Sequence, residues 1–292
     1  MAYEALRDYL KNSELRIADK NLYFRMSPEL TQKYDAGVYD LAVSEQVGCI
    51  HELIALNLLP NNDKKFYVYL VPDDRFVELL VYPYKDREQG GRPVQCFDKD
   101  GLNIAYGSSQ NLFVLEKKSG QLSHVMDLHE YAHLIQYEFA CKDLLFNEGF
   151  AELVPWYLLG YENRIQSHIN TVLNTDIYAA GQILGKPDVF RDVVENRPAS
   201  FQKSYMSSYI FIRTIIEKIE EKHNLDKVGA TKLWLNWICE TKKNRGLLVM
   251  EFAEKLGLDA DRLLYTTGYQ KELLRKMKTT GRINIPSKEI IR

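Results

Sequence analysis

Apolar residues recur at helical spacing through most of the chain. Between Ser27 and Pro60 they return every three or four positions, and Ser27 followed by Pro28 is suited to begin a helix. We therefore predict one long amphipathic helix over this range. After residue 120 the same periodicity predicts six further helices, over Ser123–Phe139, Phe146–Leu159, Phe201–His223, Asp226–Trp237, Leu247–Leu256 and Asp259–Met277.

Two runs are typical of β-strands instead. The first, KKFYVYLVP at Lys64–Pro72, is rich in aromatic and β-branched residues. The second, AYGSSQNLFVL at Ala105–Leu115, follows a run of turn formers. The segment Tyr84–Asp100 between them is either a surface loop or a hairpin near a cleft. This order of elements predicts an α+β fold, with a small mixed β-sheet in the first part and a mostly helical C-terminal lobe.

Composition narrows the classes of partner. The 292 residues include 38 basic and 40 acidic side chains, so the net charge of −2 offers no excess for phosphate backbones or anionic lipids. We expect no nucleic-acid partner and no membrane association, and the oligomeric state stays open. The four cysteines are far apart and are expected to be buried thiols. Without a visible signal peptide or transmembrane run, a cytoplasmic location is expected.

The run MDLHEYAHLIQY carries the clearest candidate chemistry. His129 and His133 lie four residues apart on a predicted helix, offset by only about 40° around its axis, so both imidazoles can reach one ion. Glu130 lies beside that ion as a candidate base. The alternative is a polar stripe on a half-exposed helix. A second HE pair, His51 and Glu52 in HELIA, lacks the later histidine and is assigned no role.

A third metal ligand is expected from the next helix. In LLFNEGFAELVPWYLLG, Asn147 is a candidate helix cap and Glu148 opens an apolar-periodic run. A short connection at Cys141–Leu145 allows this helix to pack against the preceding one. That packing would bring Glu148 opposite the histidine pair, as a catalytic zinc site with three protein ligands requires.

HEYAH followed by NEGFAE resembles the gluzincin metallopeptidases, the group of thermolysin and the aminopeptidase-N-like enzymes. The resemblance implies a gluzincin-like fold and one zinc ion per chain, held by His129, His133 and Glu148. It also implies that Glu130 is the general base and that Glu152 orients a ligand histidine. The fourteen residues between His133 and Glu148 are fewer than in the best-known members.

The resemblance extends to two weaker segments. SYMSSYIFIRTI is similar to the aminopeptidase segment that supplies a tyrosine to the oxyanion; Tyr205 matches that position best, and Tyr209, one turn later, is the rival donor. YGSSQN is similar to a segment on the substrate-bordering strand, which suggests Gln110 and Asn111 as substrate-binding residues. Gln110 is neutral where the aminopeptidases carry a glutamate for the substrate amine.

Together these features imply a zinc metallopeptidase that acts on a peptide or protein substrate and cleaves inside the chain. The expected organisation is an N-terminal α+β lobe over 1–141, carrying the HEYAH helix, and a helical lobe over 142–292, carrying the third ligand. The two lobes would form one catalytic unit with a cleft between them. The alternative is a catalytically weak or inactive gluzincin-like scaffold with a binding or regulatory role.

Overall fold

The structure is a computed structural model of the whole chain. It describes residues 14–19, 22–26, 32, 36–58, 66–70, 128–129, 131–133, 135, 144–161, 180–184, 198–240, 245–266, 268–269, 271–272 and 275. The strand predicted at Ala105–Leu115 and the loop at Tyr84–Asp100 lie outside these residues. The chain divides into two compact units, residues 1–138 and 139–292, and each is described by itself. The predicted cleft between two lobes stays a prediction.

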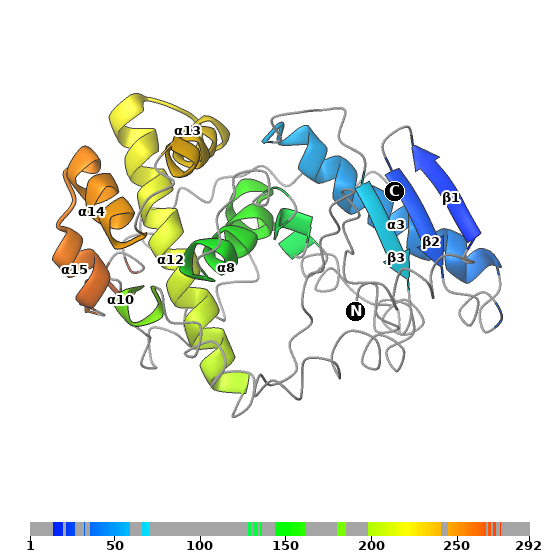
Figure 1. Ribbon diagram of the computed structural model, residues 1–292, viewed down its shortest axis with the longest axis horizontal. Coiled ribbons are helices and arrows are strands. Elements are labelled where there is room, and N and C mark those ends of the chain that lie inside the picture. The colour runs from blue at the N-terminus through cyan, green and yellow to red at the C-terminus, as the bar shows by residue number, and fades with distance from the viewer. Residues whose placement is uncertain are drawn as a thin grey trace. The chain divides into compact units, whose positions relative to one another are not determined.

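The first unit contains a three-stranded sheet in the order β1-β2-β3 (Figure 1). Strand β1 (Glu14–Asp19) pairs antiparallel with β2 (Leu22–Met26), and β2 pairs parallel with β3 (Phe66–Leu70). Strand β3 lies within the run predicted as a strand, whereas the hairpin of β1 and β2 was not predicted. Parallel pairing of β2 and β3 requires a long crossover connection, and the segment between them includes helix α3.

Helix α3 spans Ala36–Ala55 and confirms the centre of the long helix predicted from Ser27 to Pro60. Its side chains Cys49, Ile50 and Leu53 are buried, while His51 in the HELIA run is exposed. The helix ends before Asn57, whose φ of 51° lies in the left-handed region that asparagine tolerates better than most residues.

The predicted α+β class is wrong. The regular structure of the described residues is 86% helical, which makes it all-α, and its strands are three short ones of five or six residues. The physical reason is the length of chain that each sequence pattern covers. Helical periodicity runs through long stretches, whereas the confirmed strand signal covers only five residues, and the second signal lies outside the described part of the chain.

The second unit is helical. Its elements are α8 (Leu144–Leu153), the π-helical turn η2 (Val154–Leu158), α10 (Ala180–Ile183), α12 (Pro198–His223), α13 (Lys227–Glu240), α14 (Arg245–Leu256) and α15 (Ala260–Tyr265). Helix α15 begins where predicted, because the Asp259 carboxylate accepts the backbone N–H of Arg262 as a cap. It ends at Tyr265, since Thr266 is extended, so the single helix predicted to Met277 is interrupted.

Helix α12 is the centre of this unit. Its middle, from residue 206 to 216, is buried on every side, and it packs against α8, α10, α13 and α14 (Figure 1). Four aromatic side chains join three of these helices: Phe146 and Phe150 of α8, Phe211 of α12 and Trp234 of α13. Burial on every side is typical of a helix at the core of a protein.

Helices α8 and α12 approach each other closely at Gly149. A β-carbon at this position would lie 2.5 Å from the carbonyl oxygen of Ser208 and 2.6 Å from Cγ1 of Ile212. Only a glycine allows the backbones to meet so closely. The α12 residue at this contact is also small, since Ser208 is a fully buried serine.

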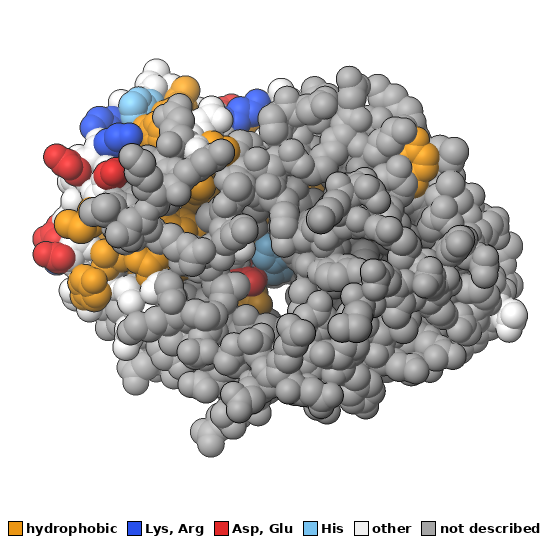
Figure 2. All heavy atoms as spheres, viewed as in Figure 1, with side chains coloured by type: hydrophobic (Ala, Val, Ile, Leu, Met, Phe, Trp, Pro, Cys, Tyr) orange, Lys and Arg blue, Asp and Glu red, His pale blue; other side chains and the backbone are white. Residues whose placement is uncertain are grey.

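Exposed charges on the helical unit are of both signs. Figure 2 shows acidic, basic and hydrophobic side chains side by side over the region of α14 and α15. Glu251, Glu254, Lys255, Asp261 and Arg262 are among the exposed residues there. Among the described residues, no helix is both long and apolar enough to cross a membrane.

Replacing Gly149 by alanine is expected to destabilise the protein. The added methyl group overlaps the Ser208 carbonyl, and such overpacking costs about 1–3 kcal/mol. Gly48 is the matched control, because it lies inside α3 and a β-carbon there would have no atom within 4 Å. Gly48→Ala should raise the free energy of unfolding by up to about 1 kcal/mol. Urea unfolding, monitored by circular dichroism, measures the free energy of unfolding of both variants. An equal change in the two variants would contradict the close contact at Gly149.

Candidate metal centre

The first two candidate ligands come from a helical segment of the HEYAH run. Leu128, His129, Tyr131–His133 and Ile135 are helical in the structure. Leu128, Tyr131, Ala132 and Ile135 are buried, and they anchor one side of this segment in apolar surroundings. The two histidines therefore occupy the remaining face together, as the four-residue spacing predicts.

The imidazole rings of His129 and His133 are close neighbours. Their centroids lie 5.0 Å apart, and the ring planes are nearly perpendicular, at 87°. His133 is only 7% exposed, and His129 is half-buried. Two rings so placed can direct nitrogen atoms to a common point while remaining partly shielded from water.

Glu148 is supplied by α8. Its neighbours Leu145, Phe146, Phe150 and Ala151 are fully buried and hold the helix in the core. Glu148 itself is half-buried, and its Oε2 atom is shielded from solvent. Burial of a carboxylate is costly unless a positive charge or a metal compensates it.

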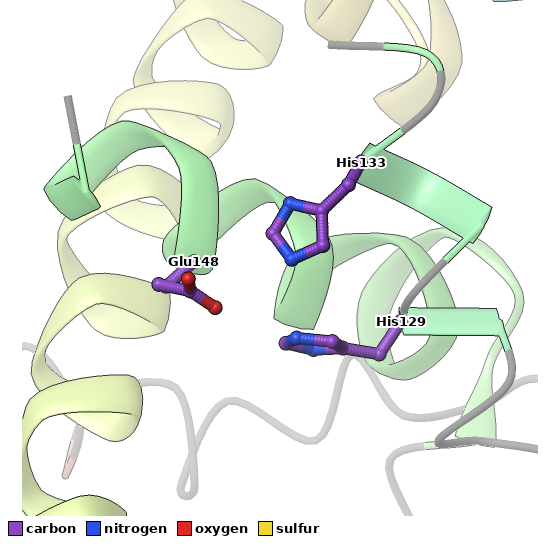
Figure 3. A group of neighbouring side chains, drawn as sticks. All are labelled: His129, His133 and Glu148. Carbon is purple, nitrogen blue, oxygen red and sulfur yellow. The ribbon is translucent and has the colours of Figure 1, made fainter. Parts of the chain in front are cut away.

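The three side chains converge. One ligand atom from each of His129, His133 and Glu148 lies within 4.8 Å of the other two, and Figure 3 shows the side chains pointing toward one another. In a tetrahedral zinc site with bonds near 2.0–2.1 Å, ligand atoms are about 3.3 Å apart. Because the three ligand atoms converge, this cluster could hold a metal ion.

Glu152 lies one turn after Glu148 and is also half-buried. Its Oε2 atom accepts a hydrogen bond from the indole Nε1 of Trp156, four residues later on the same helical segment. This contact restrains the Glu152 carboxylate. The expected role of Glu152 in orienting a ligand histidine stays a prediction.

The two tyrosines considered as oxyanion donors have different surroundings. Tyr205 is half-buried, whereas Tyr209 is fully buried. The hydroxyl of Tyr209 accepts a hydrogen bond from Nη1 of Arg213 at 2.8 Å. Sequence analysis missed Arg213 and Trp156. The signal for Arg213 was present, because a single charge interrupts the apolar run YIFIRTII.

Three of the predicted site residues lie outside the described part of the chain. They are Glu130, the candidate general base, and Gln110 and Asn111, the candidate substrate contacts. The roles assigned to them stay predictions. The structure thus brings together the three predicted ligands of the metal and describes the surroundings of Glu152, Tyr205 and Tyr209.

Comparisons with known proteins find no match for this chain among protein families, curated proteins or solved structures. The candidate metal centre therefore rests on its own residues.

Removing the Glu148 carboxylate is expected to weaken metal binding. The wild-type chain should bind one Co²⁺ or Zn²⁺ ion, and Glu148→Ala should bind it at least about 10-fold more weakly, because one of three ligands is lost. Glu254→Ala, an exposed carboxylate on α14, is the control and should bind as the wild type does. Isothermal titration calorimetry measures both. Equal affinity of the Glu148 variant would exclude this residue as a ligand.

Proposed function

We propose that the protein is a zinc-dependent metallopeptidase that hydrolyses peptide bonds within its substrate. The observation that carries this proposal is the convergence of His129, His133 and Glu148 within 4.8 Å. Two imidazoles and one carboxylate are a ligand set found in catalytic zinc sites, which leave one position open. The resemblance of HEYAH and NEGFAE to the gluzincins supports the same proposal.

Each polar residue of the proposed site has a distinct task. His129, His133 and Glu148 would hold the ion. As a Lewis acid, the ion would lower the pKa of bound water to about 7. Glu130 would accept the proton of the attacking water and pass it to the leaving nitrogen. A carboxylate directly after the first histidine of this motif is suited to that transfer, because it belongs to the same turn.

Tyr205 is the better candidate for the oxyanion donor. A donor must reach a substrate that enters from solvent, and Tyr205 is half-buried while Tyr209 is 0% exposed. The Tyr209 oxygen already accepts a hydrogen bond from Arg213, which ties it to the core of α12. A well-placed donor to the oxyanion contributes about 3 kcal/mol to catalysis.

The proposed substrate is a peptide or protein cut away from its ends. Gln110 would offer a neutral amide where a carboxylate would be needed to bind a free amino terminus. Asn111 beside it would pair with the substrate backbone, as residues on a sheet edge do. Both assignments rest on the sequence.

Glu130→Gln should abolish most hydrolysis while leaving metal binding intact. The amide cannot accept the proton of water, and loss of a general base lowers turnover by about 10²–10⁴-fold. Glu52→Gln is the matched control, because Glu52 follows His51 on a helix in the same HE dipeptide but has no role in the proposal. Cleavage of a quenched fluorescent peptide library is compared with metal content. Chelator-insensitive cleavage, or wild-type turnover in the Glu130 variant, would contradict the proposal.

Conservative substitution separates the two tyrosines. Tyr205→Phe should lower kcat by about 10²-fold with unchanged metal affinity, because the hydroxyl that would contact the oxyanion is lost. Tyr209→Phe should keep turnover within a few-fold, but it should cost about 1–3 kcal/mol of stability, because a buried hydrogen-bond partner of Arg213 is removed. Steady-state kinetics and urea unfolding are measured on both variants. The reverse pattern would assign the donor role to Tyr209.

A further inference from the structure

Helix α8 is joined to α12 near its middle by the glycine contact, defined as the approach of Gly149 to the Ser208 carbonyl. Glu148 immediately precedes this contact and Glu152 follows it by less than one turn. Phe146 and Phe150 add aromatic contacts to α12 and α13 at the same turn. The segment beyond Glu152 is attached separately, and this further attachment limits how far the helix can tilt and move the Glu148 side chain.

The helix changes geometry directly after Glu152. Pro155 has no backbone N–H, so it cannot bond to the carbonyl of Ala151 as an α-helix requires. The chain forms the wider turn η2 instead, in which the N–H of Leu159 bonds to the Val154 carbonyl at 3.0 Å. Such π-helical turns are rare in proteins, and those that occur are often found at functional sites. Contacts from other elements are expected to stabilise this one.

Those contacts converge on Tyr157, and we call them the Tyr157 clamp. The Tyr157 hydroxyl donates to Oε1 of Glu220 at 2.7 Å, and its backbone carbonyl accepts from Nζ of Lys227 at 2.7 Å. The guanidinium carbon of Arg213 lies 4.5 Å from the centre of its ring. Burial, together with the Glu220 carboxylate, raises the pKa of the Tyr157 phenol, so the hydroxyl remains a donor.

Arg213 connects the clamp to the core of α12. It is only 5% exposed, and its Nε donates to Oε1 of Glu217 at 3.0 Å, which compensates part of its charge. Its Nη1 donates to Tyr209, one turn after Tyr205. One buried cation of α12 thus contacts both the turn that follows Glu152 and Tyr209, which lies one turn after Tyr205 on its own helix. Removal of a buried charge from such a network affects every partner.

We infer that Arg213 is a positioning residue for the metal centre, which acts through Tyr157 to hold α8 in the orientation that places Glu148. This inference rests on the proposed metal site. The glycine contact and the Tyr157 clamp hold this helical segment at two points, just over two turns apart at about 3.6 residues per turn, with Glu152 between them. Loss of the attachment beyond Glu152 would let the end of this segment tilt, and the carboxylate ligand would move relative to the histidines.

Arg213→Met tests this directly, because methionine preserves much of the apolar stem but removes the charge and the hydrogen bonds. On the full-length chain, Co²⁺ should bind about 10-fold more weakly, with an altered visible absorption spectrum. Arg213→Lys retains the cation beside the Tyr157 ring and should recover at least half of the lost binding free energy. A spectral change with this partial rescue is not expected from loss of stability alone.

Arg262→Met is the matched control. Arg262 also lies over a tyrosine ring, that of Tyr269 at 4.7 Å, but it is an exposed residue of α15. Its substitution should leave Co²⁺ affinity and the spectrum unchanged. If Arg213→Met does not fold, Tyr157→Leu takes its place, because it removes the ring and the hydroxyl while the arginine remains, and it should weaken Co²⁺ binding to a similar extent.

The outcomes separate this inference from the proposed function. A wild-type chain that binds no Co²⁺ overturns both. Metal-dependent hydrolysis by the wild type, combined with wild-type Co²⁺ affinity and spectrum in folded Arg213→Met or Tyr157→Leu, overturns the positioning role alone. Weakened binding in these variants, with the Arg262 control unaffected, supports it.

Discussion

At Gly149, helix α8 lies so close to helix α12 that a β-carbon would sit 2.5 Å from the carbonyl oxygen of Ser208. This contact holds the helix that carries Glu148 directly on α12, whose middle is buried on every side. The aromatic cluster of Phe146, Phe150 and Trp234 completes the packing on either side of the same turn. Because protein cores are densely packed, this contact limits how far α8 can slide along α12. The position of the Glu148 carboxylate depends in part on that seating.

The candidate metal centre combines groups that are unfavourable together in the absence of a cation. A partly buried carboxylate and two partly buried imidazoles lose hydration, and an ion with three protein ligands compensates that loss. Buried apolar residues anchor each of the segments that carry the three donors. Preorganisation of this kind favours binding, because fewer side-chain degrees of freedom are lost when the ligands close on the ion.

Polar residues within the otherwise apolar part of α12 have specific contacts. Arg213 bonds to Glu217 and Tyr209 and lies over Tyr157, and the Thr214 hydroxyl donates to the carbonyl of Ile210. A buried cation is unfavourable unless it is paired and hydrogen-bonded, so such a residue stays in a core only where its partners are arranged around it. The π-helical turn at Pro155 likewise depends on partners arranged around it, since residues of α12 and α13 contact it at Tyr157. The π-helical turn lies on the segment that follows the third ligand, and Arg213 contacts that turn from α12.

The sequence by itself determined the local features of the site. The spacing of His129 and His133 places both on one face of a helical segment, and the pattern around Glu148 predicted the helix that carries it, because helical periodicity depends only on neighbouring residues. It did not reveal the β1-β2 hairpin, because strand pairing depends on contacts outside the local pattern. It also did not reveal the all-α class, because the share of the chain that forms strands depends on that pairing. Only the tertiary structure decided that three ligand atoms converge, that Tyr209 is buried while Tyr205 is not, and that Arg213 reaches Tyr157. Each of these three features depends on how α12 packs on other elements or on how separate segments meet. The physical reason is that packing between helices is set by contacts that no local sequence pattern contains.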